Sequence, residues 1–195
     1  GKVLLIVNTA SQCGFTPHSG SMAGEKIGWA KAAAVAAAEM LGRRDLIGVV
    51  AFDTEAHWVV PLQRNGTASR TRARIRQLDA NGGTDMMPGL EQGYRAIRGA
   101  PASIKHVVCL TDGQTPPAAF NQLAAKMRAA GITTSGVAVG PDADRMLLSN
   151  IAKAGGGKFY YLISPKAIPQ IFMREARRVS MPLVFEDKNG FGVNV

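Results

Sequence analysis

Short aliphatic runs alternate with longer amphipathic segments along almost the whole chain, and this alternation constrains the fold more than any other feature. Runs such as 2–7 and 104–110 are apolar throughout, as strands buried on both faces are. Segment 24–41 instead carries an apolar stripe with the period of a helix, which Gly42 closes. Strands that alternate with helices form a largely parallel sheet covered by helices on both faces.

The length and the turn residues predict one domain, because 195 residues can bury one sizeable core. We expect the domain at 1–180 and a tail or linker stub at 181–195. Asp53 to Glu55 form a turn, so the run after them is expected to return as an antiparallel edge strand, and Pro116 and Pro117 are expected to open a helix. The expected strands are 2–7, 45–52, 57–62, 104–110, 132–139 and 158–163, and the expected helices are 24–41, 68–78, 88–97, 116–130, 143–154 and 165–179.

The chain is strongly basic, with 23 Lys and Arg against 14 Asp and Glu, a formal net charge of +9 and a pI near 10.0. Such a charge attracts acidic partners or nucleic acid. The densest basic stretch contains Arg70, Arg72, Arg74 and Arg76, and a spacing of two places consecutive arginines on different sides of a helix. We therefore favour a basic solvated surface over a specific nucleic-acid site, and we keep a basic nucleic-acid binder as an alternative function.

No segment of the sequence has the pattern of a membrane anchor or a secretion signal. No apolar run reaches the roughly 18–20 residues that cross a bilayer, and no signal peptide precedes the first expected strand. The chain starts at Gly1 rather than at a methionine, which indicates a fragment or a processed chain. We expect a soluble domain, and its compartment is unknown.

Three loops carry small oxygen-bearing side chains at places where strands or helices end. They are Ser19-Gly20-Ser21-Met22, Gly82-Gly83-Thr84-Asp85-Met86 and Leu110-Thr111-Asp112-Gly113. In open parallel sheets, ligands bind at the carboxyl ends of the strands, where the strand order reverses. Hydroxyl and carboxylate oxygens suit a hard cation such as Mg²⁺. An ion held by few carboxylates stays electrophilic and can take a partner's carboxylate as its last ligand.

From Ser19 to about Val179 the sequence resembles a bacterial von Willebrand factor A domain. The resemblance implies a doubly wound, six-stranded α/β sandwich with strand order 3-2-1-4-5-6, whose second and third strands pair antiparallel at one edge. It also implies a metal-ion-dependent adhesion site (MIDAS). The matching pieces are Ser-Gly-Ser-Met at 19–22, Ile-Gly-Val-Val-Ala-Phe at 47–52, Gly-Thr-Asp-Met at 83–86, Leu-Thr-Asp-Gly-Gln-Thr at 110–115, Gly-Val-Ala-Val-Gly at 136–140 and the segment 151–157.

The resemblance assigns ligands, a cofactor and a kind of partner. Ser19, Ser21 and Thr84 would bind Mg²⁺ (or Mn²⁺ or Ca²⁺) directly, and Asp112 would bind it directly or through water. The domain would then be a non-enzymatic protein-binding module for adhesion or scaffolding, whose partner offers an Asp or Glu carboxylate. Similar segments occur in large bacterial membrane proteins, some with an amidotransferase-like domain, so the parent protein is expected to be membrane-anchored.

The first acidic ligand of the family motif is missing. The motif is Asp-x-Ser-x-Ser, and two residues before Ser19 this chain has Pro17. The first expected strand ends at Asn8, well before the serines, so either the acidic ligand is lost or Asn8 stands near its place. Asparagine offers a neutral oxygen and no charge. We therefore predict a degenerate MIDAS in which the metal binds weakly or not at all.

The segment 1–17, GKVLLIVNTASQCGFTP, instead resembles the signature of glutathione peroxidases and suggests a chimera. In that family a strand leads to a reactive Cys, here matched by Cys13, and a thiol near a helix N-terminus is a better nucleophile because its pKa falls. The other motifs of that family are absent, so a thiol peroxidase using Cys13 is an alternative function, and an exposed bystander thiol is the simpler interpretation. Cys109, in an apolar run, is expected to be buried.

Overall fold

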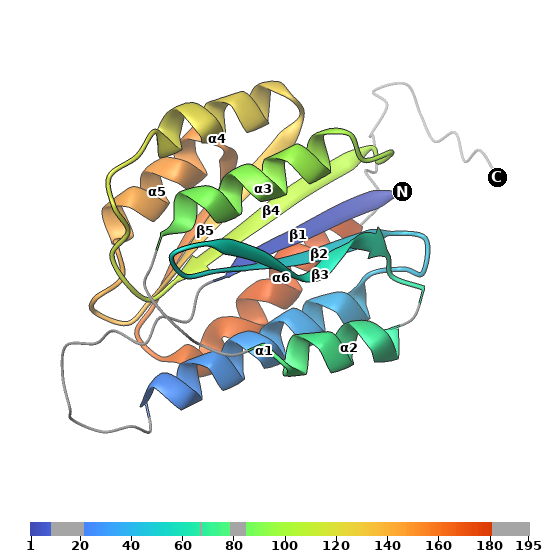
Figure 1. The fold of residues 1–195 in the computed structure, drawn as a ribbon, viewed down its shortest axis with the longest axis horizontal. Helices are drawn as coiled ribbons and strands as arrows, with labels where there is room; N and C mark the ends of the chain where they lie inside the picture. The colour runs from blue at the N-terminus through green and yellow to red at the C-terminus, as the bar shows by residue number, and fades with distance from the viewer. Residues whose placement is uncertain (9–21, 67, 79–84, 181–195) are drawn as a thin grey trace, which may run out of the picture.

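The computed structural model describes residues 1–8, 22–66, 68–78 and 85–180, and these residues form three layers with a sheet in the middle (Figure 1). Helices α1, α2 and α6 cover one face of the sheet, and α3, α4 and α5 cover the other. The strands are β1 (Lys2–Asn8), β2 (Leu46–Phe52), β3 (Ala56–Arg64), β4 (Ile104–Thr111), β5 (Ile132–Val139) and β6 (Gly156–Leu162).

The strand order is β3-β2-β1-β4-β5-β6, and every pair is parallel except β2 with β3. The predicted order and its antiparallel edge are therefore confirmed. β1 lies in the centre, where Asn8 is in register with Ala51 of β2 and Leu110 of β4. Because the five parallel strands run the same way, their carboxyl ends lie together at one edge of the sheet, on the left in Figure 1.

The helices lie within two residues of the expected bounds except at two starts. The helix expected from Pro116 begins only at Phe120, because a proline pushes the residue before it out of the helical region and Thr115 and Pro116 both precede a proline. The last expected helix divides into a short 3-10 turn, η1 (Pro165–Ala167), and α6. The α-helices are α1 (Met22–Met40), α2 (Ala68–Arg76), α3 (Met86–Arg98), α4 (Phe120–Ala129), α5 (Arg145–Ala154) and α6 (Ile168–Ser180).

Small side chains let the helices approach the sheet closely. Ala33 and Ala37 are fully buried where α1 packs against the sheet and α6. On the opposite face, Gly93 of α3 lies against β1. A Cβ added at this position would be only 2.5 Å from Leu5 Cδ2. A close-packed interior leaves no space for such an atom. These residues set how near the two helical layers lie to the central strand.

A charged residue is buried within the layer between α6 and the sheet. Glu175 of α6 has no exposed surface. Its carboxylate accepts hydrogen bonds from Ser135 Oγ at 2.7 Å and Tyr160 OH at 2.6 Å, and it lies 2.8 Å from His106 Nε2. Arg178 Nη1 lies 3.2 Å from both carboxylate oxygens. We call these five residues the Glu175 cluster, and it joins α6 to β4, β5 and β6.

The hydrogen bonds outweigh burial in setting the charge of Glu175. Burial alone would raise the pKa of this carboxyl group, but the donors of His106 and Tyr160, with the charge of His106, lower it from 4.5 to about 2. The folded protein therefore holds Glu175 ionised. The stability that results is fully present above pH 4.5 and is lost as the pH falls toward 2.

We expect this carboxylate to contribute about 3 kcal/mol to the free energy of unfolding at neutral pH, which disappears on acidification. Urea denaturation of the wild type and of Glu175→Gln between pH 7 and pH 3 measures the difference. The difference in the free energy of unfolding between the two proteins is expected to decrease as the pH falls below 4.5, where the carboxyl group of the unfolded chain takes up a proton. A gap that stays constant over this range would contradict the prediction.

Candidate functional site

Asp112 lies at the carboxyl end of β4, the strand beside the central β1. Its side chain is nearly buried, and the loop that follows is fixed by hydrogen bonds. Gly113 N donates to Thr111 Oγ1 at 3.3 Å, and Gln114 Nε2 donates to the carbonyl of Asp142 at 2.8 Å. Asp112 is thus held at the edge of the sheet where ligands of such folds bind.

The carboxylate of Asp112 forms an ion pair with Lys26, a residue that the sequence analysis did not select. Lys26 Nζ lies 3.2 Å from Asp112 Oδ2, and the two side chains are 21% and 9% exposed. Lys26 belongs to the N-terminal half of α1, and its ammonium lies beside Gly140, just after β5, where a Cβ would be 3.6 Å from Nζ. A pair with so little exposure is screened less than a surface salt bridge.

The other expected ligands are placed only in part. Ser19, Ser21 and Thr84 lie outside the described residues, as does Cys13. The backbone of Asn8 ends β1 in register with Leu110, so Asn8 and Asp112 belong to neighbouring strand ends. The convergence of the expected ligands therefore stays a prediction.

Among the expected ligands, the structure describes the side chain of Asp112 alone. Within residues 1–8, 22–66, 68–78 and 85–180, no three His, Cys, Asp or Glu side chains form a group that could hold a metal. The one expected carboxylate, that of Asp112, already holds an ammonium. A second cation at the same oxygen would meet the charge of Lys26 at short range.

The side chain of Asp85, next to the expected ligand Thr84, accepts a hydrogen bond from the backbone. It is the N-cap of α3, and its Oδ1 accepts a hydrogen bond from Met87 N at 3.1 Å. Met86 N donates to Thr115 Oγ1 at 3.0 Å, and Asp85 N donates to the carbonyl of Asp53 at 2.6 Å. These bonds tie the start of α3 to the turn after β2 and to the loop that carries Asp112.

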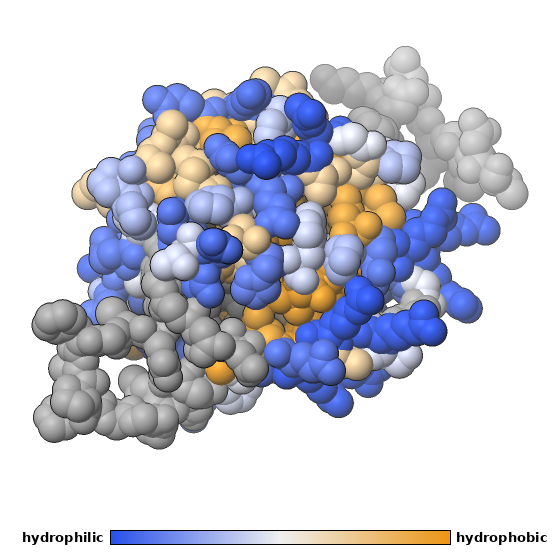
Figure 2. Space-filling view, in the orientation of Figure 1, coloured by the Kyte–Doolittle hydropathy of each residue, from blue (hydrophilic) through white to orange (hydrophobic). Residues whose placement is uncertain are grey.

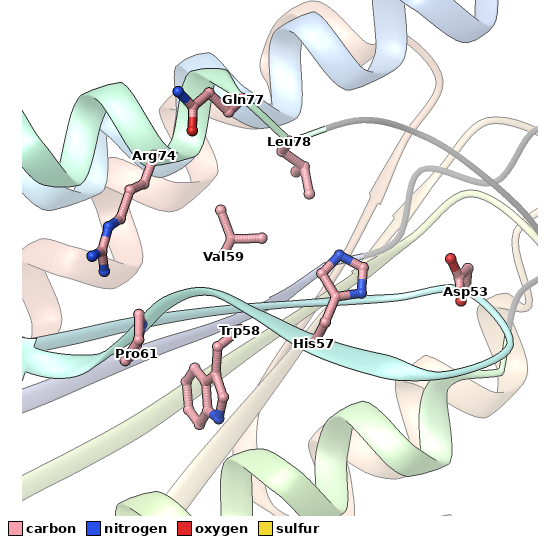
Figure 3. A pocket seen from close by; sticks show the side chains of 8 residues that line it. All are labelled: Asp53, His57, Trp58, Val59, Pro61, Arg74, Gln77 and Leu78. Atoms are coloured by element: carbon pink, nitrogen blue, oxygen red, sulfur yellow. The ribbon is translucent and has the colours of Figure 1, made fainter.

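A separate pocket of about 600 Å³ opens between β3 and α2, at the antiparallel edge of the sheet (Figure 3). Figure 2 shows hydrophobic side chains between these two elements, with hydrophilic ones around them. Arg74 and Asp53 stand at opposite ends of the pocket, so its lining carries both charges. The residues that line it are Asp53, His57, Trp58, Val59, Pro61, Arg74, Gln77 and Leu78.

The basic residues of α2 do not form one stripe. Arg72 pairs with Glu39 of α1 at 3.6 Å, while Arg74 lines the pocket beside β3. The predicted distribution of these arginines over different sides of the helix is confirmed for this pair. This arrangement does not favour a continuous contact with a nucleic-acid backbone.

Cys109 is a fully buried free thiol on β4, as predicted. Burial raises the pKa of this thiol far above its ordinary value, because the thiolate would lose its hydration. Cys109 is therefore an unreactive core residue. None of the helices in the described segments is both long and apolar enough to cross a lipid bilayer.

Comparisons with known proteins agree with this architecture. The model of the von Willebrand factor type A domain matches residues 18–174. An uncharacterized protein of Synechocystis is 28% identical over 173 residues, which are 86% of this chain and 41% of that protein.

Two solved structures show the same fold. A von Willebrand factor type A protein from Catenulispora acidiphila is 28% identical, with a TM-score of 0.74, over 90% of this chain and 42% of its own. Proximal thread matrix protein 1 of the mussel byssus, solved with a zinc-occupied MIDAS motif, has a TM-score of 0.74 at 16% identity, over 92% of this chain and 48% of its own. The chain thus spans less than half of each of these proteins. With the family model matching residues 18–174 and the sheet in the order 3-2-1-4-5-6, the chain belongs to the von Willebrand factor type A domain family.

Proposed function

We propose that this domain is a protein-binding module whose partner docks at the carboxyl ends of the strands and offers an Asp or Glu side chain to the site around Asp112. The observation that carries this proposal is the nearly buried Asp112 at the end of β4, with a cation held against it. Family membership supports a binding role. The net charge of +9 further favours acidic partners, because it raises their local concentration near the domain.

We propose a binding role rather than catalysis because of the chemistry of this pair. Lys26 and Asp112 are held as an ammonium and a carboxylate that neutralise each other, which suits charge recognition. Neither group is an activated nucleophile of the kind that covalent catalysis requires. No specific observation favours the thiol peroxidase through Cys13 or the nucleic-acid binder.

We also propose that the MIDAS is degenerate and that Mg²⁺, Mn²⁺ or Ca²⁺ binds weakly. Pro17 occupies the position of the first acidic ligand, and the remaining certain carboxylate, Asp112, is neutralised by Lys26. Mg²⁺ gives up its water reluctantly and needs well-placed charged oxygens to do so. Since the Synechocystis relative is more than twice as long as the matched part, we propose that the domain is one part of a larger protein. That this protein is membrane-anchored is proposed only from the resemblance to segments of bacterial membrane proteins.

Selection from a phage-displayed random peptide library tests the binding proposal. We expect the wild type to enrich peptides that contain Asp or Glu. When that residue becomes Asn or Gln, the affinity of each selected peptide for the domain should fall at least about tenfold, because a charge-assisted contact is lost. Asp112→Ala is expected to lose the same peptides, because Asp112 holds the cation that meets the partner, whichever cation that is.

Asp142→Ala is the matched control, since Asp142 is an exposed acid on a neighbouring loop whose side chain is not part of the site. This variant should bind like the wild type, and circular dichroism should show that both variants are folded. A library without acidic enrichment, or equal binding by Asp112→Ala, would refute the proposed function.

A further inference from the structure

On the basis of the function proposed above, we further propose that the Lys26 ammonium takes the place of the divalent ion at Asp112, so that the domain recognises a partner's carboxylate without metal. In this arrangement Lys26 both excludes the metal and receives the acidic side chain. The inference names the recognising group of the site and predicts that binding continues in the presence of a chelator.

The position of the ammonium supports this assignment. Three elements meet at it: α1 supplies Lys26, the end of β4 supplies Asp112, and Gly140 follows the end of β5. Gly140 has a φ of +82°, which favours glycine at this turn, and its N–H donates to the carbonyl of Leu162 at 2.8 Å. The bulk of a side chain is thus absent where the lysine passes, and the ammonium reaches the Asp112 carboxylate.

The charges make Lys26 and a metal mutually exclusive. One ammonium neutralises one carboxylate, so the pair attracts a further cation far less than a lone Asp112 would. Two unit charges of the same sign 4 Å apart repel by about 4 kcal/mol at the effective dielectric constant near a protein surface, and the repulsion from a doubly charged ion is larger. A divalent ion at Asp112 therefore binds at a cost while Lys26 stays at Oδ2, or it has to displace Lys26.

The ammonium also has the chemistry to bind the partner. Lysine carries three N–H donors, and a single ion pair with Asp112 does not occupy all of them. With 21% of its side chain exposed, Lys26 is accessible from solvent, while Asp112 at 9% is not. An incoming carboxylate therefore meets the positive member of the pair, held in place by the buried negative one. The ion pair would repel a basic side chain of the partner less strongly than an unpaired Lys26 would, but it would not bind that side chain.

Mn²⁺ titration, followed by electron paramagnetic resonance and calorimetry, tests the exclusion directly. We expect Lys26→Met, which keeps the length of the side chain without its charge, to bind Mn²⁺ at least about tenfold more tightly than the wild type, a lower bound from the repulsion above. Its melting temperature should also rise when Mg²⁺ is added, because an ion that binds only the folded state stabilises it.

Lys153→Met is the matched control, because it removes the same charge from an exposed position on α5. It should behave like the wild type. Equal Mn²⁺ affinity in Lys26→Met and the wild type, whether both are tight or both are undetectable, would overturn the inference, since Lys26 would then not be what excludes the metal.

The second arm tests carboxylate recognition with a defined probe. The lysine Cε–Hε signals of uniformly ¹³C-labelled protein, whose ammonium groups are unmodified, are observed by NMR in the presence of a chelator, while acetyl-Gly-Asp-Gly-amide or its Asn counterpart is added in excess. The signal that is absent from Lys26→Met should shift with the Asp peptide alone. No shift would overturn the recognition half. Because the Mn²⁺ result needs no partner, failure of the peptide selection alone would refute the proposed function and leave the exclusion of metal by Lys26 standing.

Discussion

Replacing Glu175 with alanine is expected to lower the free energy of unfolding by about 3–5 kcal/mol, the cost of removing one partner from a buried ionic network. The carboxylate is the common acceptor for donors from β4, β5 and β6, so its loss leaves His106 Nε2 and Ser135 Oγ without this partner in the core. Both are buried, and buried polar groups without an acceptor are costly. Urea denaturation at pH 7 measures the change.

Glu91→Ala is the control for this variant. Glu91 is also a helical glutamate with an arginine partner, Arg95 at 2.8 Å, but both side chains are well exposed. Its replacement should cost about 0.5 kcal/mol or less, as expected for an exposed i,i+4 pair. If Glu175→Ala cost no more than Glu91→Ala, the Glu175 cluster would have no special role in holding α6 against the sheet.

Gly157→Ala is expected to lower the free energy of unfolding by at least about 3 kcal/mol, the upper end of the usual cost of overpacking. A Cβ at this position would lie 2.1 Å from the carbonyl oxygen of Thr134 and 2.8 Å from the backbone nitrogen of Ser135. The obstructing atoms are backbone atoms of β5, so no side-chain rotation can relieve the contact. The strands β5 and β6, whose register is already irregular here, would have to separate.

Gly28→Ala is the matched comparison, because a Cβ at Gly28 of α1 would meet nothing within 4 Å. Alanine is the better helix former, so this variant is expected to gain about 0.5–1 kcal/mol. Thermal and urea unfolding of the two variants should therefore give shifts of opposite sign. A Gly157→Ala protein as stable as the wild type would show that β6 is not held as tightly against β5 as the contacts indicate.

The strands could be predicted because each buried strand has its own local sequence pattern. Val3, Leu5 and Val7 pack on one face while Leu4 and Ile6 pack on the other, so a strand buried on both sides needs an unbroken aliphatic run. The family resemblance then supplied the strand order. The start of α4 was harder to predict, because proline suits both a first helical turn and an extended approach to a helix, and neighbouring residues decide between them.

The sequence predicted the place of Asp112 but did not indicate Lys26, which pairs with it. Asp112 follows the most apolar strand of the middle of the chain, and the fold rule for strand ends points to it. Lys26 is one of many basic residues and is far from Asp112 in the sequence. The available signal was its place early in the first helix, whose start must lie near the carboxyl ends of β1 and β4. The ion pair itself depends on packing, which the sequence pattern does not specify.

Glu175 carried a clearer signal that was missed. In α6 the buried positions are Ile168, Ile171, Phe172, Glu175, Ala176 and Val179. A single acidic residue on an otherwise apolar helical stripe indicates a buried, hydrogen-bonded carboxylate, since an unpaired charge would not be tolerated there. Apart from Arg178 of the same helix, its donors come from three different strands, so their identity depends on the sheet topology and not on the periodicity of the helix.

The ends of the described domain lie together, and this determines how the domain can be tethered. The Lys2 ammonium donates to the carbonyl of Ser180, so the first strand begins where the last helix ends. Asp112 follows the opposite end of β4, eight residues beyond Ile104, which is in register with Lys2, so it lies roughly 26 Å away at about 3.3 Å per strand residue. Segments attached at these two points would hold the domain by one end of the sheet, and Asp112 would lie at the end that points away from them. Tension applied through such segments would act on the ends of β1 and α6 and not directly on the binding site proposed around Asp112.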